Sequence, residues 1–385
     1  MLTALPLSRL LFLVLAIVVA VGPGCSGQSF RLKAVGTNGA ITVVIDSVDW
    51  NGRVGELVRS RLSPIIETFP MPERMFELES RSVATQSDYD RVTAQKNLVF
   101  VASLEDSSGV ARILESAFSP GALDAVRRGQ PAFVVRDDLW RRDQNVVYLA
   151  AATTEQLEEL VDRAAPEIRD LFNRAERERL EADMFGRGRQ HDLEAILMES
   201  HDFRVQVQHD YLIAADTTSF VWLRRILADT WRSVFVHYIE YANPVLIEPD
   251  WIYAIRDSLA RTFLRGNVGG FVQTDYRRPL ETREVDFLDR YALETRGLWH
   301  MVGPDDEGEI VEYGMGGPFV NYTFYDQESG RIYMIDGMVF APGFEKREFV
   351  RQLEVIAYTF ASRADTESQV VADSRHPTES RVIEG

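Results

Sequence analysis

ITVVIDSVDWNGRVGELVRSRL, residues 41–62, shows the pattern from which we predict the fold class of this chain. Its first five residues form a compact β-branched run, which favours a strand. Apolar side chains then recur at Val54, Leu57, Val58 and Leu62, the spacing of one face of a helix. A strand followed directly by an amphipathic helix predicts helices packed against a sheet.

Similar patterns continue on the C-terminal side of this stretch. In the first half we expect strands at residues 75–83, 98–104, 132–136 and 146–151, and helices at 109–128 and 153–172. Gly186 and Gly188 mark a boundary. In the second half we expect helices at 193–198, 220–231, 249–263 and 349–360, and strands at 204–214, 234–241, 283–293, 298–302, 319–325 and 332–340.

Both halves contain the order β-α-β-α-β-β-α with extra strands, a pattern that suggests an internal duplication. We therefore expect an α+β fold of two related units, each an antiparallel sheet with packed helices. The expected organisation is a signal peptide at 1–24, a lipidated tether at 25–38, a first unit at 39–185, a second unit at 186–363 and a disordered tail at 364–385.

The N-terminus has the pattern of a secretory signal. Residues 1–9 carry one cation, residues 10–21 are an unbroken apolar run of twelve, and Gly22-Pro23-Gly24 breaks the helix. The run is shorter than the roughly 20 residues that cross a bilayer as a helix. We expect cleavage after Gly24, so that the mature chain begins near Cys25.

Cys25 is the only cysteine, which excludes internal disulfides and a cysteine-based zinc site. Its place directly after the cut site resembles the bacterial lipoprotein signal, which implies acyl chains, palmitate among them, on its thiol and amine. No Asp follows in Ser26-Gly27-Gln28, so the resemblance favours the outer membrane. Gly22 and Pro23 depart from the usual signal, and a secreted protein with a leftover thiol is the alternative.

The chain is strongly acidic, with 42 Lys and Arg against 59 Asp and Glu and a net charge of −17. Such a surface repels phosphate backbones, so we expect no nucleic-acid partner. Lys33, Lys96 and Lys346 are its only lysines. Spread-out acidity favours a halophile-like surface over an acidic patch for a cationic partner. GC-rich codons would also explain the excess of arginine.

Three stretches carry a family resemblance: residues 41–62, TRGLWHM at 295–301, and GGPFVNYTFYD through GMVFAP at 316–342. In this order they resemble the Bacteroidota envelope lipoproteins of the domain of unknown function 4837 (DUF4837) family, through nearly the whole mature chain. PDDEGEIVEY at 304–313 looks like an insertion. The resemblance implies a lipid-anchored envelope protein and supplies no activity, cofactor or catalytic residue.

Three His-Asp pairs begin at His191, His201 and His209. Imidazole beside carboxylate suits a metal site or an acid–base pair. On a helix, however, His191 and His201 would lie about 80° apart, and His209 falls on the next element. Polar residues at element ends are the simpler interpretation, and a hydrolase that uses the 191–216 stretch is the alternative.

The other polar motifs indicate no chemistry. Asp305, Asp306, Glu307 and Glu309 offer oxygen ligands for calcium but lack the spacing of an EF-hand, so we expect a solvated acidic turn. The glycine run at 314–317 precedes a strand instead of a helix, which indicates a tight turn or a bulge. We expect no cofactor and assign no catalytic residue.

Aromatic side chains gather late in the chain, at Trp299, Phe319, Tyr322, Phe324, Tyr325, Tyr333 and Phe340. Apolar residues occupy both faces of the 319–325 strand, which predicts a central strand covered on both sides. We interpret the cluster as core. An aromatic groove for a glycan or a peptide is the functional alternative.

The sequence thus favours a periplasm-facing lipoprotein that binds or scaffolds without catalysis at the outer membrane. Its partners would be the membrane, through N-terminal acyl chains, and envelope proteins or glycans. A metal-dependent or acid–base hydrolase is the alternative. A carrier of soluble ligands is a third possibility, and it requires an enclosed aromatic cavity.

Overall fold

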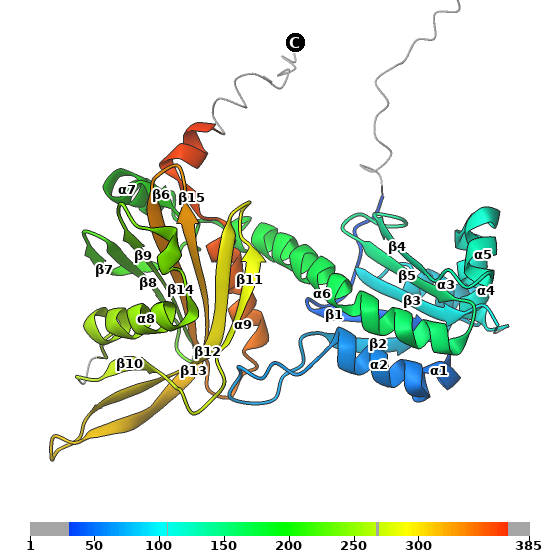
Figure 1. The fold of residues 1–385 in the computed structure, drawn as a ribbon, viewed down its shortest axis with the longest axis horizontal. Helices are drawn as coiled ribbons and strands as arrows, with labels where there is room; N and C mark the ends of the chain where they lie inside the picture. Colours follow the sequence, from blue (N-terminus) through cyan, green and yellow to red (C-terminus); the bar gives the residue numbers. More distant parts are fainter. Residues whose placement is uncertain (1–30, 106, 267–268, 369–385) are drawn as a thin grey trace, which may run out of the picture.

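The computed structural model describes residues 31–105, 107–266 and 269–368. They contain a five-stranded sheet in the first half of the chain and an eight-stranded sheet in the second. The 32-residue helix α6 (Thr154–Phe185) joins the two halves, and Figure 1 shows it running between the sheets. Helices packed on both sheets confirm the predicted α+β class.

The first half forms its sheet and helices in alternation. The elements before α6 are β1 (Ala40–Ile45), α1 (Ser47–Asn51), α2 (Arg53–Leu62), β2 (Glu77–Arg81), α3 (Gln86–Val92), β3 (Asn97–Ser103), α4 (Gly109–Ala117), α5 (Pro120–Arg127), β4 (Ala132–Asp137) and β5 (Asn145–Ala151). The strands predicted at 98–104 and 146–151 are therefore confirmed as β3 and β5.

The first sheet has the strand order β2-β1-β3-β5-β4. Neighbours among β2, β1, β3 and β5 run parallel, and β4 alone is antiparallel to its neighbour. The prediction of an antiparallel sheet in this half is wrong. Every residue of β3 is buried, because helices cover both faces, and parallel strands in such sheets are almost continuously apolar.

Two hydrophobic clusters sandwich this sheet. On one face Val43 and Val101 pack with Val58 of α2 and Leu160 of α6. On the other face Phe100 and Tyr148 pack with Leu114 and Val126 of α4 and α5. The first half is therefore three layers thick, helix on sheet on helix.

The second half is dominated by strands. Its elements are α7 (His191–His201), β6 (Phe203–Arg204), β7 (Leu212–Thr217), β8 (Phe220–Ile226), β9 (Trp231–Ile239), η2 (Pro244–Leu246), α8 (Pro249–Phe263), β10 (Phe271–Thr274), β11 (Glu281–Asp286), β12 (Tyr291–Pro304), β13 (Ile310–Asp326), β14 (Arg331–Phe340), α9 (Arg347–Tyr358) and β15 (Ala361–Ser362).

The second sheet is antiparallel, in the order β10-β12-β13-β14-β9-β8-β7 with β11 paired to β12. The helix predicted at 220–231 is wrong: β8 and β9 form a hairpin there, closed by the turn in which Leu227 N–H donates to Thr230 O at 3.0 Å. Because the two sheets differ in strand order and direction, the expectation of a duplicated unit is also wrong.

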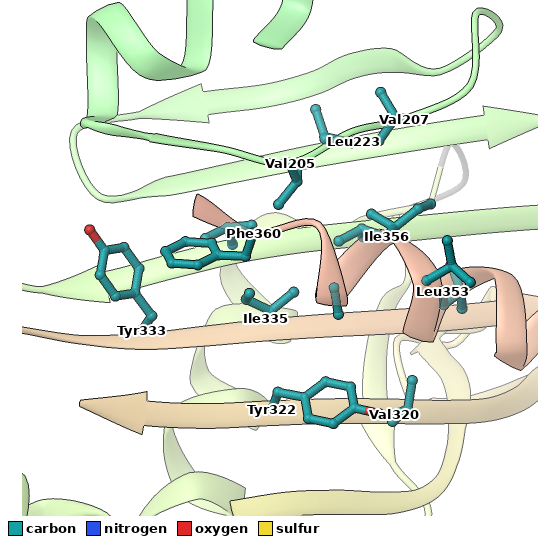
Figure 2. Close-up of a cluster of buried hydrophobic side chains, with 14 of the residues drawn as sticks. Val205, Val207, Leu223, Val320, Tyr322, Tyr333, Ile335, Leu353, Ile356 and Phe360 are labelled. Atoms are coloured by element: carbon teal, nitrogen blue, oxygen red, sulfur yellow. The ribbon is translucent and has the colours of Figure 1, made fainter. Parts of the chain in front are cut away.

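The two faces of the second sheet bury different clusters. On one face Tyr322, Tyr333 and Ile335 form one core cluster with Leu353 and Ile356 of α9, which Figure 2 shows, and the ring centroid of Tyr333 lies 4.8 Å from that of Phe360. On the other face a second cluster packs beneath α8: Phe319, Phe235 and Met334 with Ile252 and Leu259. The prediction of a central strand covered on both sides is confirmed for β13.

A fully buried ion pair crosses the α8 face. The side chains of Arg256 and Asp336 are 1% and 0% exposed, and Arg256 Nε lies 2.8 Å from Asp336 Oδ2. Asn321 Nδ2 donates to the same carboxylate at 3.0 Å, and Arg256 also donates to Thr274 Oγ1 at 2.8 Å. The guanidinium stacks on Phe319, with Cζ 3.5 Å from the ring centroid. This network fixes α8 on the sheet.

Helix α6 and the side chain of Glu73 connect the two halves. α6 contributes Leu160 and Phe172 to the core of the first half and Met184 to the core of the second. Buried Glu73, from the first half, accepts hydrogen bonds from the backbone N–H of Lys346 at 2.8 Å and of Arg347 at 2.9 Å, at the start of α9. A carboxylate of one half therefore caps a helix of the other.

The ordered chain extends beyond the expected limits of the tether and the tail. Ala34 is buried, and Lys33 and Val35 form bridges to Arg142 and Gln95. Beyond residue 363, Asp365 accepts a hydrogen bond from Arg290 at 2.7 Å. Residues 31–38 and 364–368 therefore pack on the fold.

Candidate functional site

An apolar pocket of about 250 Å³ lies on the α8 face of the second sheet. Its wall is the chain that follows α8, at Leu264, Arg265 and Gly266, together with Val272 of β10. Aromatic and sulfur-containing side chains line the rest: Trp222, Trp231, Trp299, Met301, Met315, Met338 and Phe340. Aromatic and methionine surfaces suit apolar ligands, and methionine adapts readily to their shape.

Strand alternation places these residues on one face. Trp222 and Arg224 are two apart on β8, so both side chains point to the α8 side. In the paired strand, Arg224 lies opposite Ser233, which also lines the pocket. A Cβ on Gly266 would lie 2.9 Å from Met301 Sδ, so glycine allows the wall to approach the strands closely.

Two polar groups of the pocket, the guanidinium of Arg224 and the indole N–H of Trp222, have no charged or hydrogen-bonding partner among the described residues. Arg224 Cζ lies 4.7 Å from the centroid of Trp222 and 5.7 Å from that of Trp231, and Arg224 has no ion pair with any carboxylate the structure describes. Burial lowers the pKa of Arg224. Trp222 is 9% exposed and its Nε1 has no acceptor among the described residues, whereas Trp299 Nε1 donates to Val339 O at 3.2 Å.

A second cavity, of about 400 Å³, lies at the junction of the two halves, and its lining is charged. Arg296 Nε lies 2.8 Å from Glu294 Oε1, and the same guanidinium reaches Glu354 at 2.6 Å. Arg283 approaches Glu294 at 2.8 Å. Because these arginines and glutamates already pair with one another, their charges are not free to bind a ligand. We therefore take the apolar pocket, and not the junction cavity, as the candidate binding site.

Glu294 makes stability depend on pH. Burial alone would raise its pKa, but the charges and hydrogen bonds of Arg296 and Arg283 outweigh burial and hold the pKa of Glu294 well below its usual range. A carboxylate with a lowered folded-state pKa stabilises the protein above its unfolded pKa of about 4.3, and this stability is lost as the pH falls further.

We therefore expect the free energy of unfolding to fall more gently below pH 5 in Glu294→Gln than in the natural protein. Urea unfolding at pH 7, 5, 4 and 3 measures the slope. Glu56→Gln, at an exposed carboxylate, is the control and should keep the natural slope. Equal slopes for Glu294→Gln and the natural protein would contradict this account.

The three histidines singled out by the sequence do not converge. His191 and His209 are exposed, and His191 Nδ1 lies 3.3 Å from Arg189 Nε. His201 is buried; its Nε2 lies 2.8 Å from Asp216 Oδ1 and its Nδ1 3.2 Å from Tyr238 Oη. Since both ring nitrogens of His201 have partners, this residue links α7 to β7 and β9.

Nothing among the described residues forms a metal site of three or more His, Cys, Asp or Glu side chains. The acidic residues of 305–309 lie near the tip of the β12–β13 hairpin, which projects from the sheet in Figure 1. Asp305 Oδ1 accepts hydrogen bonds from the backbone N–H of Glu307 and Glu309 at 2.9 Å. This confirms the acidic turn.

The glycines at 314–317 lie within β13, opposite a register shift between His300 and Val302 of β12. This irregularity confirms the predicted bulge. A Cβ on Gly317 would lie 2.0 Å from Val339 O, so glycine is required there for close strand packing.

The late aromatic residues divide between core and pocket. Phe319, Tyr322, Phe324 and Tyr333 are buried in the two cores, as the core interpretation predicts. Trp299, a member of the α8-side core, and Phe340, which packs against that core, also line the pocket. The sequence analysis missed Trp222, Arg224 and Trp231, because a helix was predicted there. The alternation of Phe220, Trp222 and Arg224 is the signal of a strand face.

Cys25 and the apolar run at 10–21 lie outside the described residues. Within the part that the structure describes, no helix combines the length and the apolar character needed to cross a membrane.

Family models match the two halves separately. One, described as domain of unknown function (DUF4837), matches residues 190–359, and another, described as domain of unknown function (DUF8532), matches residues 34–185. The resemblance expected across nearly the whole mature chain is thus confirmed for the second half, while the 41–62 stretch falls in the other match. No curated protein matches the chain.

Among solved structures, similarity is found to the Ran-binding protein Mog1p of Saccharomyces cerevisiae. The identity is 12% and the TM-score 0.28, with 43% of this chain and 92% of that chain covered. A mutant of protein Mog1 gives 12% identity and a TM-score of 0.27, with coverage of 43% and 93%.

Proposed function

We propose that this chain, whose residues 190–359 belong to the DUF4837 family, is a lipid-anchored envelope lipoprotein that binds a small apolar ligand without transforming it. The description of the family states no activity. The observation that carries the proposal is the pocket of three tryptophans and three methionines beside α8. Large apolar pockets with few polar groups are typical binding sites for small molecules.

The pocket favours binding over catalysis. An engineered apolar cavity of about 150 Å³ holds a benzene molecule, and this pocket, at about 250 Å³, is larger. Ser233 carries the one hydroxyl among the described residues that line it, and these residues include no histidine, aspartate or glutamate to activate that hydroxyl or to serve as general acid. Arginine remains protonated in proteins and orients ligands instead.

The proposed anchor would hold this binding unit close to the membrane. Arg31 already contacts the fold, since its guanidinium donates to Leu139 O at 3.2 Å. The chain from Cys25 to Arg31 spans at most about 20 Å when fully extended. A lipidated Cys25 would therefore keep the first half near the bilayer surface, facing the periplasm, with envelope proteins or glycans within reach.

Binding is tested with a neutral apolar dye, N-phenyl-1-naphthylamine, whose fluorescence rises in an apolar site. We expect saturable binding of one dye per chain. Ser233→Phe fills the pocket from β9 and should weaken dye binding at least tenfold. Ser116→Phe, at an exposed position on α4, is the matched control and should leave it unchanged. Unaltered binding in Ser233→Phe would exclude this pocket as the site.

The anchor is tested by Cys25→Ser. We expect this variant to lose acyl labelling and to move from the membrane fraction to the soluble periplasmic fraction, because one serine cannot carry the thioether-linked chains that hold the protein in the bilayer. Ser26→Ala is the control and should stay membrane-bound. A Cys25→Ser variant that keeps its acyl label and its membrane location would refute lipidation.

A further inference from the structure

The charge of the pocket is opposite to that of the protein. In a chain of net charge −17, the described residues that line the pocket include three arginines and no aspartate or glutamate. Arg232 points to the other face, where it stacks on Phe349 and donates to Gln352. Arg224 and, at the exposed rim, Arg265 remain as cations on the pocket side.

Arg224 differs from the other arginines that lie against this sheet. Arg225, its neighbour on the opposite face, lies 2.7 Å from Asp210, and Arg256 beneath α8 pairs with Asp336. Arg224 contacts only aromatic rings among the interactions of the described residues. A partly buried cation without a counter-ion attracts an anionic group strongly, because the surrounding apolar walls screen little.

Trp222 supplies a second unpartnered donor beside Arg224. Its indole N–H is buried and has no acceptor among the described residues, and leaving such a group unpaired is unfavourable. A carboxylate or phosphate oxygen in the pocket would accept from Trp222 and Arg224 together. A neutral hydrocarbon would leave both donors unpaired.

Three tryptophans around a cavity also resemble an aromatic cage for a quaternary ammonium group. Here, however, the faces of Trp222 and Trp231 already carry the guanidinium of Arg224. A second cation would meet like-charge repulsion. The charge therefore selects against cationic ligands.

From these observations we infer that the pocket binds an anionic amphiphile, an apolar chain or ring that ends in one carboxylate or phosphate, with the head group at Arg224 and Trp222 and the apolar part against Trp299, Met301 and Met338. This inference rests on the proposed function, since it names the ligand class of the same site. It makes Arg224 the residue that determines specificity.

The test compares ligands of one chain length: decanoate, decyl phosphate, 1-decanol and decyltrimethylammonium. Affinities are measured by displacement of N-phenyl-1-naphthylamine from the full chain carrying Cys25→Ser, which removes the need for detergent. We expect the two anions to bind about 10- to 100-fold more tightly than decanol, as one charge-assisted hydrogen bond implies, and the cation to bind most weakly. Each added methylene should strengthen binding about fourfold.

Arg224→Met keeps an apolar stem and removes the charge. It should weaken the binding of both anions far more than the binding of decanol, because the hydroxyl of decanol loses at most a neutral hydrogen-bond acceptor interaction and no charge attraction. Trp222→Phe should weaken the anions about threefold to tenfold, because it removes the N–H and keeps a ring. Arg261→Met is the control: Arg261 stacks on Phe271 outside the pocket lining, and its loss should change neither class.

The outcomes separate the two proposals. Equal affinity for decanol and decanoate, or anion binding unaffected by Arg224→Met, would overturn the ligand class and leave the binding function standing. Displacement by decanoate alone or by decyl phosphate alone would identify which head group the site takes. If neither the dye nor any of the four amphiphiles binds, both the ligand class and the proposed function fail.

Discussion

Asp336→Ala should lower the free energy of unfolding by about 3–5 kcal/mol, because it leaves Arg256 as a buried, unpaired charge. The guanidinium is 1% exposed, and its Nε and Nη2 lie 2.8 and 3.3 Å from the two carboxylate oxygens. Thr274 and Phe319 remain as neighbours, but neither offers a counter-charge. Urea unfolding followed by circular dichroism measures the loss.

Two further variants test the physical cause. Arg256→Met combined with Asp336→Ala removes both charges, and it should recover part of the stability that the single variant loses. Glu56→Ala breaks the exposed Arg53–Glu56 pair, which has a similar distance of 2.9 Å, and should cost no more than about 1 kcal/mol. A double variant that is less stable than Asp336→Ala would show that the unpaired charge is not the cause.

Glu73→Ala should lower the free energy of unfolding by at least about 2 kcal/mol, since two buried backbone donors each cost about 1–3 kcal/mol when left unpaired. These donors are the N–H groups of Lys346 and Arg347, at the first turn of α9. Water does not readily replace the carboxylate, because Glu73 is only 8% exposed. Thermal and urea unfolding of the full chain measure the effect.

A matched control exists elsewhere in the chain. Glu105 accepts from the N–H of Thr154 at 2.8 Å at the start of α6, but it is exposed. Water can take its place, so Glu105→Ala should cost less than about 1 kcal/mol. Glu73→Gln keeps one acceptor oxygen and should lie between Glu73→Ala and the natural protein. Similar losses for Glu73→Ala and Glu105→Ala would argue against burial as the reason.

Local patterns in the sequence predicted much of the secondary structure. The β-branched run at 41–45 makes up all of β1 except its first residue, and the apolar faces at 54–62 and 349–360 correspond to α2 and α9. These predictions succeed because a helix that buries one face, or a short strand that is buried entirely, has a characteristic spacing of apolar residues that can be recognised in the sequence. The alternation around Phe319 likewise predicted a strand packed on both sides.

Strand direction and pocket formation depend on longer-range packing. The apolar run of β3 is equally compatible with a parallel strand and with a buried antiparallel one, so direction follows from which helices cross over. In FVWLRRILADTW, at 220–231, the spacing of the apolar residues fits both a helix and a strand. The segment forms strands because β8 pairs with β9, and β9 pairs on its other side with β14. The pocket was missed because its residues come from six strands and from the chain that follows α8.

Because helix α6 contributes side chains to both cores, a cut between the two halves of the protein should affect both fragments. The family matches end at 185 and begin at 190, which invites a cut between them. Such a cut would leave Met184 on the first fragment as an uncovered apolar side chain and remove it from the core of the second. Each fragment would then lack surface that the other supplies. Co-expressed fragments should reassemble by complementation, whereas either one alone should aggregate.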